Sequence, residues 1–374
     1  MVFPDYKNSV VNVSSSVIAA LGGRVKYRPL KKLAFLKESQ KIVLLVIDGL
    51  GYEFLKKYGQ GSFLWKNCAD KITSVFPTTT ASAETSLETG VAPQQHAIIG
   101  FTMLLKELGV VSKILLFNVR GGGSLMEMGV NRSDIYTEKV IMEKISVPSV
   151  MVMPRITAAR FGSSRWAAIF DDLAGMVNQV KKAVLTIDNR FVYSYWIDLD
   201  KMCHKYGSAS AEAKNHFIEI DRAIEDLAGF LKKQNAVLLV TADHGLCDVP
   251  DKNRIILQDY PDVYDCLVLP LCGDSRASSC YVRPERVKEF KRLVEKQLGF
   301  CCTLHKGSDF IKKGVFGLGV ANPRLHERVG DYILAAKEGY TIRDLLFSEA
   351  KSKMKGHHGG LSQEEMYVPL IIIR

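Results

Sequence analysis

Acidic side chains stand at the ends of three apolar runs in this 374-residue chain. Each acid comes at or shortly after the end of its run: Asp48 after residues 41–47, Asp200 after 191–197 and Asp243 after 236–241. A carboxylate beside a buried strand is costly unless a cation pairs with it, and metal ions pair with several carboxylates at once. Because ligands bind beyond the carboxyl ends of the strands in an open parallel sheet, the pattern predicts a metal site at that edge.

Histidines accompany these acids. Asp200 and His204 are four residues apart, so one helical turn would place both side chains on the same face. His244 directly follows the third acid, and the sequence GHHGG at 356–360 adds two histidines where glycines let the backbone approach an ion closely. Mixed Asp and His ligands suit zinc, and also manganese or iron, so we expect divalent ions of this kind.

Three threonines precede a helical stretch in the segment SVFPTTTASAETSLETG, residues 74–90. The pattern predicts a strand-like piece at 74–76, a break at Pro77 and a helix that ends at Gly90. The threonines then lie near a helix N-terminus, where backbone N–H groups and the helix dipole favour an anion. A hydroxyl there can be ionised by an adjacent metal ion and attack phosphorus, although N-capping alone also explains threonine at this place. The local sequence does not choose among Thr78, Thr79 and Thr80.

The apolar runs are rich in branched residues and predict strands that are buried on both faces, as in a parallel sheet. Amphipathic helical patterns occur at 209–233 and at 283–298. Strands that alternate with helices predict an α/β fold with a doubly wound, mostly parallel central sheet flanked by helices. The run 368–373 supplies a last strand.

The region 261–346 breaks this alternation. It combines a strand-like piece at 279–282, the second helical pattern and loops rich in glycine. We therefore expect a catalytic core made of residues 1–260 and 347–374, and a small α+β insert at 261–346 that shapes the substrate pocket.

The composition is that of a globular protein with an excess of positive charge. Apolar residues make up 47% and the formal net charge is +10. The basic residues are spread along the chain, so the charge indicates a general attraction for anionic substrates or simply a solvated surface, rather than nucleic-acid binding. No apolar run approaches the roughly 20 residues that span a bilayer, and the first residues lack the pattern of a secretion signal, so we expect a cytoplasmic location. The eight cysteines form no CxxC pair and are expected to be free thiols. The sequence does not indicate an oligomeric state.

Five segments together resemble the alkaline phosphatase superfamily, and within it the nucleotide pyrophosphatase/phosphodiesterase (type I phosphodiesterase) family. They are VIDGLG (46–51), FPTTTASAETSLETGVAPQQHAIIG (76–100), DKMCHKYG (200–207), TADHGL (241–246) and HHGG (357–360). They occur in the family's order and span nearly the whole chain, and only their combination is specific. The resemblance implies an alkaline phosphatase-like fold and a metal-dependent hydrolase of phosphate esters or nucleotides, of the phosphodiesterase or nucleotide pyrophosphatase type.

The resemblance also implies residue roles. Thr80 is the nucleophile, because it matches the family position just ahead of the helical stretch. The residues around the first zinc ion are Asp48, Thr80, Asp243 and His244, and those that hold the second are Asp200, His204 and His358. Two such ions, roughly 3.5–4 Å apart, would clamp the attacking and leaving oxygens of an in-line displacement. Attack by Thr80 would give a phospho-threonine intermediate, which a hydroxide at the second ion then releases.

Two positions depart from the family pattern. The family typically has an Asn shortly after a His-Gly pair, which helps to bind a phosphoryl oxygen, whereas AIIGFT follows His96 here. Thr102 is our candidate for that substrate-binding role. The usual Gly before the second-site histidine is Cys203, a small change that should leave ligation intact. A sulfatase is disfavoured, because the chain has no Cys-x-Pro-x-Arg element.

Other activities could use the same residues. The close alternatives are a phosphomonoesterase and a phosphonate hydrolase. A metal-dependent phosphomutase, an isomerase, is a more distant one, because mutases of this superfamily usually carry a larger insert than is evident here. A non-catalytic metal-binding module is disfavoured, because every ligand position and the nucleophile are filled.

Overall fold

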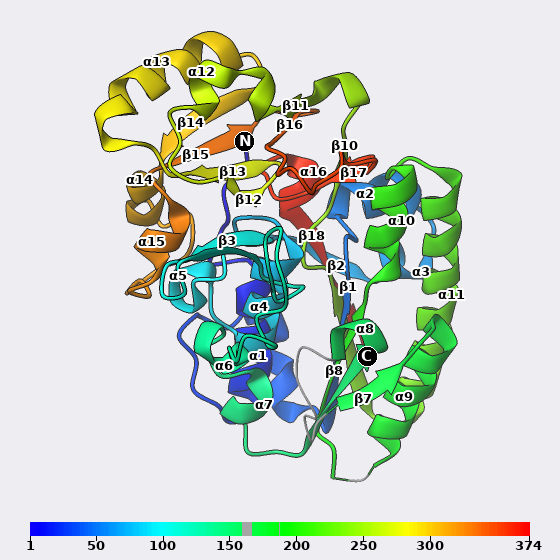
Figure 1. Ribbon diagram of the computed structural model, residues 1–374. Helices are drawn as coiled ribbons and strands as arrows, with labels where there is room; N and C mark the ends of the chain where they lie inside the picture. Colours follow the sequence, from blue (N-terminus) through cyan, green and yellow to red (C-terminus); the bar gives the residue numbers. More distant parts are fainter. Residues whose placement is uncertain (159–166, 187) are drawn as a thin grey trace.

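The computed structural model describes residues 1–158, 167–186 and 188–374. A sheet of seven strands lies at the centre of the larger part of the molecule (Figure 1). In order across the sheet the strands are β2 (Cys68–Thr73), β18 (Tyr367–Ile373), β9 (Ala236–Thr241), β1 (Lys41–Ile47), β8 (Phe191–Trp196), β6 (Ser149–Pro154) and β7 (Ala167–Phe170). The five strands from β9 to β7 are parallel, and β18 runs antiparallel to both of its neighbours. The predicted doubly wound, mostly parallel sheet is therefore confirmed.

Helices cover both faces of this sheet (Figure 1). On one side lie α2 (Tyr52–Tyr58), α3 (Phe63–Lys66), α9 (Leu173–Leu185), α10 (Asp198–Tyr206) and α11 (Ala211–Lys233), and on the other α1 (Val10–Ala20), α4 (Thr80–Thr89) and α7 (Ile141–Lys144). The short helices of the same part are α5 (Pro93–His96), α6 (Arg132–Ile135), α8 (Arg155–Ala158) and α16 (Gln363–Met366). Because helices cover both faces, every residue of β8 and β9 is buried, which explains their continuous apolar runs.

The predicted elements hold with small shifts. The helix expected at 209–233 is α11, with Phe217, Ile220 and Ile224 on its buried face. The piece expected as a strand at 74–76 is not one, because β2 ends at Thr73 and an irregular turn leads into α4. That helix ends at Gly90, whose φ of 67° is left-handed, as the sequence indicated.

A second, antiparallel sheet of seven strands adjoins the central part. Its strands, in spatial order, are β14 (Cys302–Lys306), β15 (Tyr332–Ala336), β13 (Ala277–Cys280), β12 (Cys272–Asp274), β3 (Thr102–Leu105), β4 (Val110–Lys113) and β5 (Asn118–Val119). Its helices are α12 (Pro261–Tyr264), α13 (Val287–Leu298), α14 (Gly307–Lys312) and α15 (Leu325–Val329). The sheet thus extends beyond the expected insert, since β3 to β5 come from residues 102–119. The insert boundary at 261–346 stays a prediction.

Two short ladders connect the loops between the sheets. The antiparallel pair β10 (Cys247–Asp248) and β17 (Gly356–His357) fixes the start of the GHHGG loop beside the end of β9. The second pair is parallel: β11 (Arg254–Ile256) follows β10 in the chain, and its partner β16 (Thr341–Arg343) precedes β17. The 3-10 turns are η1 (Lys31–Glu38), η3 (Asp251–Asn253), η4 (Leu257–Asp259) and η5 (Pro284–Arg286).

The cysteines and the helices also bear on the expectations for the chain as a whole. All eight cysteines are free thiols, as expected. Across the residues that the structure describes, the helices are too short or too polar for any of them to cross a membrane.

Candidate active site

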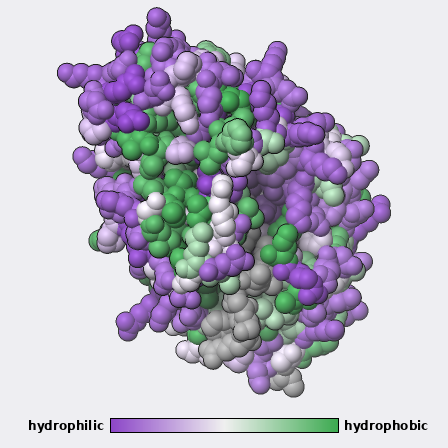
Figure 2. Space-filling model, viewed as in Figure 1, coloured by the Kyte–Doolittle hydropathy of each residue, from purple (hydrophilic) through white to green (hydrophobic). Residues whose placement is uncertain are grey.

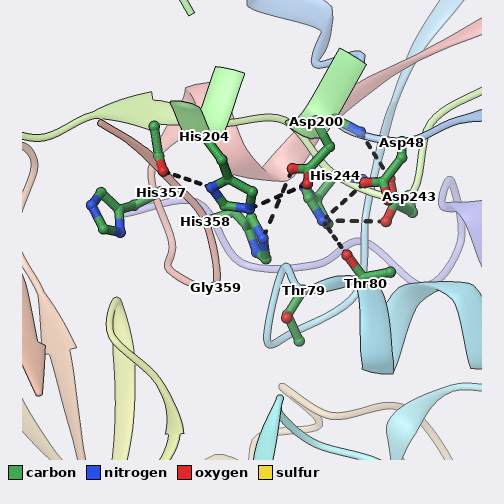
Figure 3. A network of polar contacts seen from close by, with 12 residues as sticks. Asp48, Thr79, Thr80, Asp200, His204, Asp243, His244, His357, His358 and Gly359 are labelled. Atoms are coloured by element: carbon green, nitrogen blue, oxygen red, sulfur yellow. Dashed lines mark hydrogen bonds and ion pairs between the residues drawn. The ribbon is translucent and has the colours of Figure 1, made fainter. Parts of the chain in front are cut away.

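Three neighbouring parallel strands bring the predicted acids to one edge of the central sheet (Figure 3). Asp48 directly follows β1, Asp243 lies two residues beyond β9, and Asp200 lies in the first turn of α10, just after β8. All three carboxylates are buried, with exposed fractions of 8% or less. The side chains that the sequence spacing predicted to converge therefore do so.

Asp48 and Asp243 form the first cluster together with His244. Nε2 of His244 lies 3.2 Å from Oδ2 of Asp243 and 3.6 Å from Oδ1 of Asp48. The hydroxyl of Tyr195, from β8, lies 2.8 Å from Oδ2 of Asp48 and 3.1 Å from Oδ2 of Asp243, so it can donate to one carboxylate at a time. The backbone N–H groups of Gly49 and His244 donate to Oδ1 of Asp243, and they fix the orientation of this carboxylate.

Asp200 forms the second cluster with two histidines. Nε2 of His204, one turn later on α10, lies 3.2 Å from Oδ2 of Asp200. Nε2 of His358 lies 4.0 Å from Oδ1 of the same carboxylate. The ring of His358 stacks on that of His244, with 3.9 Å between the ring centroids, so the two clusters are contiguous.

The three histidines present their Nε2 atoms to these acids for the same reason. Nδ1 of His204 lies 2.8 Å from the carbonyl oxygen of Gly356, Nδ1 of His358 lies 3.2 Å from that of Thr78, and Nδ1 of His244 lies 3.2 Å from that of Gly245. A carbonyl oxygen only accepts, so each Nδ1 must carry the proton and donate it. Nε2 is then the ring nitrogen that can ligate a metal ion when the imidazole is neutral, which is the arrangement of a metal-ligating histidine.

His357 points away from the clusters (Figure 3). Its Nε2 lies 3.1 Å from the carbonyl oxygen of Met354, and burial lowers its pKa to about 4. His358, rather than His357, is therefore the histidine of the GHHGG loop that faces the acids, as the resemblance implied.

The carboxylates of this site affect one another's pKa values. Burial, followed by the charges of Asp243 and Asp200, raises the pKa of Asp48 well above its ordinary value, and burial also raises the pKa of Asp243. Burial raises the pKa of Asp200 as well, but the charge and hydrogen bond of His204 outweigh it and the pKa lies below its ordinary value. Oδ1 of Asp48 and Oδ1 of Asp200 are buried and accept no hydrogen bond from the described residues. Such oxygens are costly unless an ion satisfies them.

Two groups of side chains have the spacing of a metal site. One group is Asp48, Asp243 and His244, and the other is Asp200, His244 and His358; within each group the ligand atoms lie within 4.8 Å of one another. His244 thus occurs in both groups, whereas the resemblance implied His204 as the third ligand of the second ion. His204 directs its Nε2 at the same carboxylate, Asp200, from the next turn of α10. With the orphaned carboxylate oxygens and the histidine orientations, the donor set fits divalent metal ions.

The three threonines differ in what their hydroxyls contact. The hydroxyl of Thr78 donates to the carbonyl oxygen of Gly360, and that of Thr79 donates to Oδ1 of Asp274. Oγ1 of Thr80 lies 3.2 Å from Nε2 of His244. Among the three, Thr80 alone faces the predicted ligands, because it is the first residue of α4 while Thr79 is the N-cap and turns the other way.

A single cavity of about 480 Å³ opens over these residues. Its wall includes Thr80, Asp200 and His358 from the central part, and Thr102 at the start of β3 from the second sheet. Thr102, the predicted substrate-binding residue, therefore lies in the same cavity as the two clusters, and its contact with a substrate stays a prediction.

Asp274 is a site residue that the sequence did not reveal. It ends β12, lines the same cavity, and accepts hydrogen bonds from the Thr79 hydroxyl and from the backbone N–H of Phe101. Burial raises its pKa to about 6. In the sequence, a single aspartate after Cys-Gly indicates only a turn. Its place in the cavity depends on the pairing of β12 with β3, two strands that are far apart in the chain.

Tyr195 was also missed. It belongs to the apolar run of β8 and reads as a core aromatic, yet its hydroxyl is the donor between Asp48 and Asp243. Burial raises its pKa well above the ordinary value, so the hydroxyl keeps its proton and remains a donor.

Solved structures of other proteins share this fold. Murine ectonucleotide pyrophosphatase/phosphodiesterase 5 matches with a TM-score of 0.68 and 19% identity, over 88% of this chain and 87% of that one. An inactive variant of the same murine protein, in complex with AMP, matches with a TM-score of 0.67 and 19% identity, again over 88% and 87%. Phosphonoacetate hydrolase from Sinorhizobium meliloti matches with a TM-score of 0.68 and 17% identity, over 94% of this chain and 93% of that one. The likeness at these identities shows the alkaline phosphatase-like fold.

The sequence itself matches one family model over most of its length. No curated protein matches the chain. The sequence model described as type I phosphodiesterase/nucleotide pyrophosphatase, by contrast, matches residues 42–120 and 154–361, which include both clusters, Thr80 and the second sheet. The chain therefore belongs to the type I phosphodiesterase/nucleotide pyrophosphatase family, a family of phosphoric ester hydrolases in the alkaline phosphatase superfamily.

Proposed function

We propose that the chain hydrolyses phosphodiester or pyrophosphate bonds with Thr80 as the nucleophile and with two divalent metal ions, zinc being the expected element. The observation that carries this proposal is the position of the Thr80 hydroxyl, 3.2 Å from a ring nitrogen shared by both groups of metal-binding side chains.

Six side chains would divide between the two ions. Asp48, Asp243 and His244 would hold one ion next to Thr80, and Asp200, His204 and His358 would hold the other, with His244 close enough to contribute to both. When bound, such ions supply Lewis-acid catalysis: they lower the pKa of a hydroxyl and neutralise charge on phosphoryl oxygens.

The chain's own groups supply the rest of the reaction. Oγ1 of Thr80 forms a bond to phosphorus while the bond to the leaving oxygen breaks, which gives a phospho-threonine. The N-terminus of α4 favours the anionic phosphoryl group, because its first N–H groups have no partner within the helix. Water then cleaves the phospho-threonine bond and restores the hydroxyl. The hydroxyl of the neighbouring Thr79 donates a hydrogen bond to Asp274, which turns this hydroxyl away from the metal-binding side chains.

The substrates that fit this proposal are small phosphate esters or nucleotides. AMP is the ligand described for the murine relative, and phosphonoacetate hydrolase has the same fold, so a phosphonate hydrolase is the second candidate. The free state of all eight cysteines supports a reducing, cytoplasmic location as part of the proposal, which cell fractionation can check.

The test is a substrate screen on purified protein that is first stripped of metal and then loaded with zinc or manganese. The panel holds 4-nitrophenyl phosphate, bis(4-nitrophenyl) phosphate, a dinucleoside diphosphate, phosphonoacetate and a sugar phosphate. We expect metal-dependent hydrolysis that is fastest for a diester or a pyrophosphate. Faster hydrolysis of the monoester or of phosphonoacetate would replace the proposed substrate class, and isomerisation of the sugar phosphate or activity without metal would overturn the proposal.

A further inference from the structure

Among the residues that the structure describes, four lysine and arginine side chains line the active-site cavity, and three of them already have acidic partners. Lys113 lies 3.0 Å from Glu349, and Arg120 lies 2.7 Å from the same carboxylate and 2.9 Å from Asp344. Lys201 lies 2.8 Å from Asp198. Because these three cations already pair with acidic side chains of the protein, they are not available to bind an anionic ligand.

Arg343 is the fourth and differs from the others. Among the residues that the structure describes, its guanidinium makes no ion pair, hydrogen bond or ring contact, although the residue is half-buried in the cavity wall. A guanidinium beside a cavity, with no partner in the described part of the chain, is available to an anion that enters the cavity. Its five N–H donors, arranged in a fork, suit a carboxylate or phosphate group.

The backbone around Arg343 is held rigidly. Arg343 ends β16, opposite Ile256 of β11. On either side of it, Ile342 is buried in the core and the carboxylate of Asp344 is engaged by Arg120 and by the backbone N–H of Leu271. The acids nearest in sequence are thus committed elsewhere, and the guanidinium is positioned without being neutralised.

The cavity is also larger than a phosphoryl group needs. Its volume of about 480 Å³ is that of a site for an organic ligand. Apolar side chains also line the cavity, among them Leu116 (58% exposed), Ile156 (70%) and Met354 (37%). Figure 2 shows the corresponding hollow, with apolar surface along the side that carries β3. A substrate that filled it would extend well beyond the reacting phosphorus.

We propose that Arg343 binds a second anionic group, a phosphate or a carboxylate, on the part of the substrate that lies beyond the reacting phosphorus. Arg343 then determines specificity: it selects phosphate esters that carry two separated anions over esters that carry only one. This inference rests on the proposed function, because it takes the two clusters and Thr80 as the place of reaction.

The experiment compares three probes on the metal-loaded protein. Thymidine 5′-(4-nitrophenyl phosphate) carries one anion, its 3′-phosphorylated counterpart carries a second phosphate, and phosphonoacetate carries a carboxylate as its second anion. The quantity measured is the ratio of kcat/KM for a doubly anionic probe to kcat/KM for the singly anionic one. We expect Arg343→Gln to lower this ratio about 10- to 100-fold, the effect of losing a charged hydrogen bond.

Two further variants sharpen the result. Arg343→Lys keeps the charge but not the fork, so it should restore part of the ratio. Arg292→Gln, on the exposed face of α13, removes the same charge from the molecule and should leave the ratio unchanged. A fall with the phosphate probe alone identifies a phosphate as the second anion, and a fall with phosphonoacetate alone identifies a carboxylate.

A binding measurement separates this inference from the proposed function. The wild type should bind thymidine 3′,5′-bisphosphate more tightly than thymidine 5′-phosphate, and Arg343→Gln should remove most of that preference. If the preference is found but no probe is hydrolysed, the proposed function fails and the role of Arg343 stands. If Arg343→Gln changes neither the kinetic ratio nor the binding preference, or lowers the values for all ligands equally, the inference is wrong.

Discussion

The hydroxyl oxygen of Thr80 lies 3.2 Å from Nε2 of His244, whereas the hydroxyl of the adjacent Thr79 turns to Asp274. This relationship separates three consecutive threonines that the local sequence leaves equivalent. It also links the start of α4 to the end of β9, so the nucleophile and the metal ligands come from elements that the central sheet holds at one edge.

Thr80→Ala should fold normally and be nearly inactive. The hydroxyl contacts only the His244 ring among the described residues, so its removal should change the free energy of unfolding little. The loss in kcat should be at least about 10³-fold, as for other catalytic nucleophiles. Steady-state kinetics with a nitrophenyl diester measure it. Thr80→Ser, which keeps the hydroxyl, is the control and should retain part of the activity; full activity of Thr80→Ala would show that another group attacks.

Asp200→Asn and Asp198→Asn should behave differently, although the two acids are two residues apart on α10. Asp200 faces His204 and His358, while Asp198 pairs with Lys201 on the more exposed side. We expect Asp200→Asn to lower kcat/KM by several orders of magnitude at low zinc concentration, and Asp198→Asn to change it less than about threefold, as for a surface ion pair. Similar losses in both variants would contradict the assignment of Asp200 as a ligand.

Removal of metal should lower the melting temperature. Without a cation, burial and mutual repulsion raise the pKa values of Asp48 and Asp243, which marks an unfavourable cluster of buried carboxylates. A ligand at 100 times its Kd stabilises the folded state by about 2.7 kcal/mol, so each bound zinc ion should raise the Tm of the chelated protein by roughly 3 °C. Differential scanning calorimetry after chelation and after zinc addition checks this. An unchanged Tm would mean that the clusters do not bind zinc.

Arg276→Met should destabilise the chain strongly. Arg276 and Glu365 are fully buried, their closest atoms lie 2.7 Å apart, and Glu365 also accepts the backbone N–H of Gly360 in the loop that carries His358. Removing one partner of a buried pair leaves an unpaired charge and costs about 3–5 kcal/mol. Urea unfolding measures this cost. Lys26→Gln, which breaks the exposed pair with Glu138, should cost less than about 1 kcal/mol. Equal costs for the two variants would show that the buried pair of Arg276 and Glu365 does not stabilise the fold.

Stability should fall as the pH decreases from 7 to 5, and His96 should cause part of the loss. Burial, then the charges of Arg328 and Lys144, lowers the pKa of His96 to about 3 in the folded state. The unfolded chain binds the proton near pH 6.5, so His96 favours folding fully above that pH and loses this contribution as the pH falls toward 3. The loss by pH 5 is about 2 kcal/mol, from 1.5 pH units at 1.36 kcal/mol each.

Unfolding of His96→Gln at both pH values tests this. The variant should be less sensitive to acid than the wild type, whereas the exposed His326→Gln should match the wild type. If the three proteins lose equal stability between pH 7 and pH 5, His96 does not contribute.

The sequence predicted those parts of the site that depend on local patterns. Apolar runs identified the strands, and the four-residue spacing of Asp200 and His204 identified their common helix face, both of which are present. Other features depend on contacts between distant segments, which no local sequence pattern encodes. They are the place of β18 between β2 and β9, and the pairing of residues 102–119 with 272–336 in one sheet. Asp274 was missed because only that pairing brings it to the cavity, and Arg343 was missed because its place depends on the equally distant pairing of β16 with β11. Tyr195 was missed because a buried hydroxyl partner cannot be told from a core aromatic by its spacing.

We propose that Asp48, Asp243 and His244, together with Asp200, His204 and His358, hold two metal ions beside Thr80. Anomalous diffraction from crystals of the zinc-loaded protein tests it most directly. We predict two zinc peaks roughly 3.5–4 Å apart, one within bonding distance of Asp48 and the other within bonding distance of Asp200. No peak at this edge of the sheet, or two peaks remote from the Thr80 hydroxyl, would contradict the account.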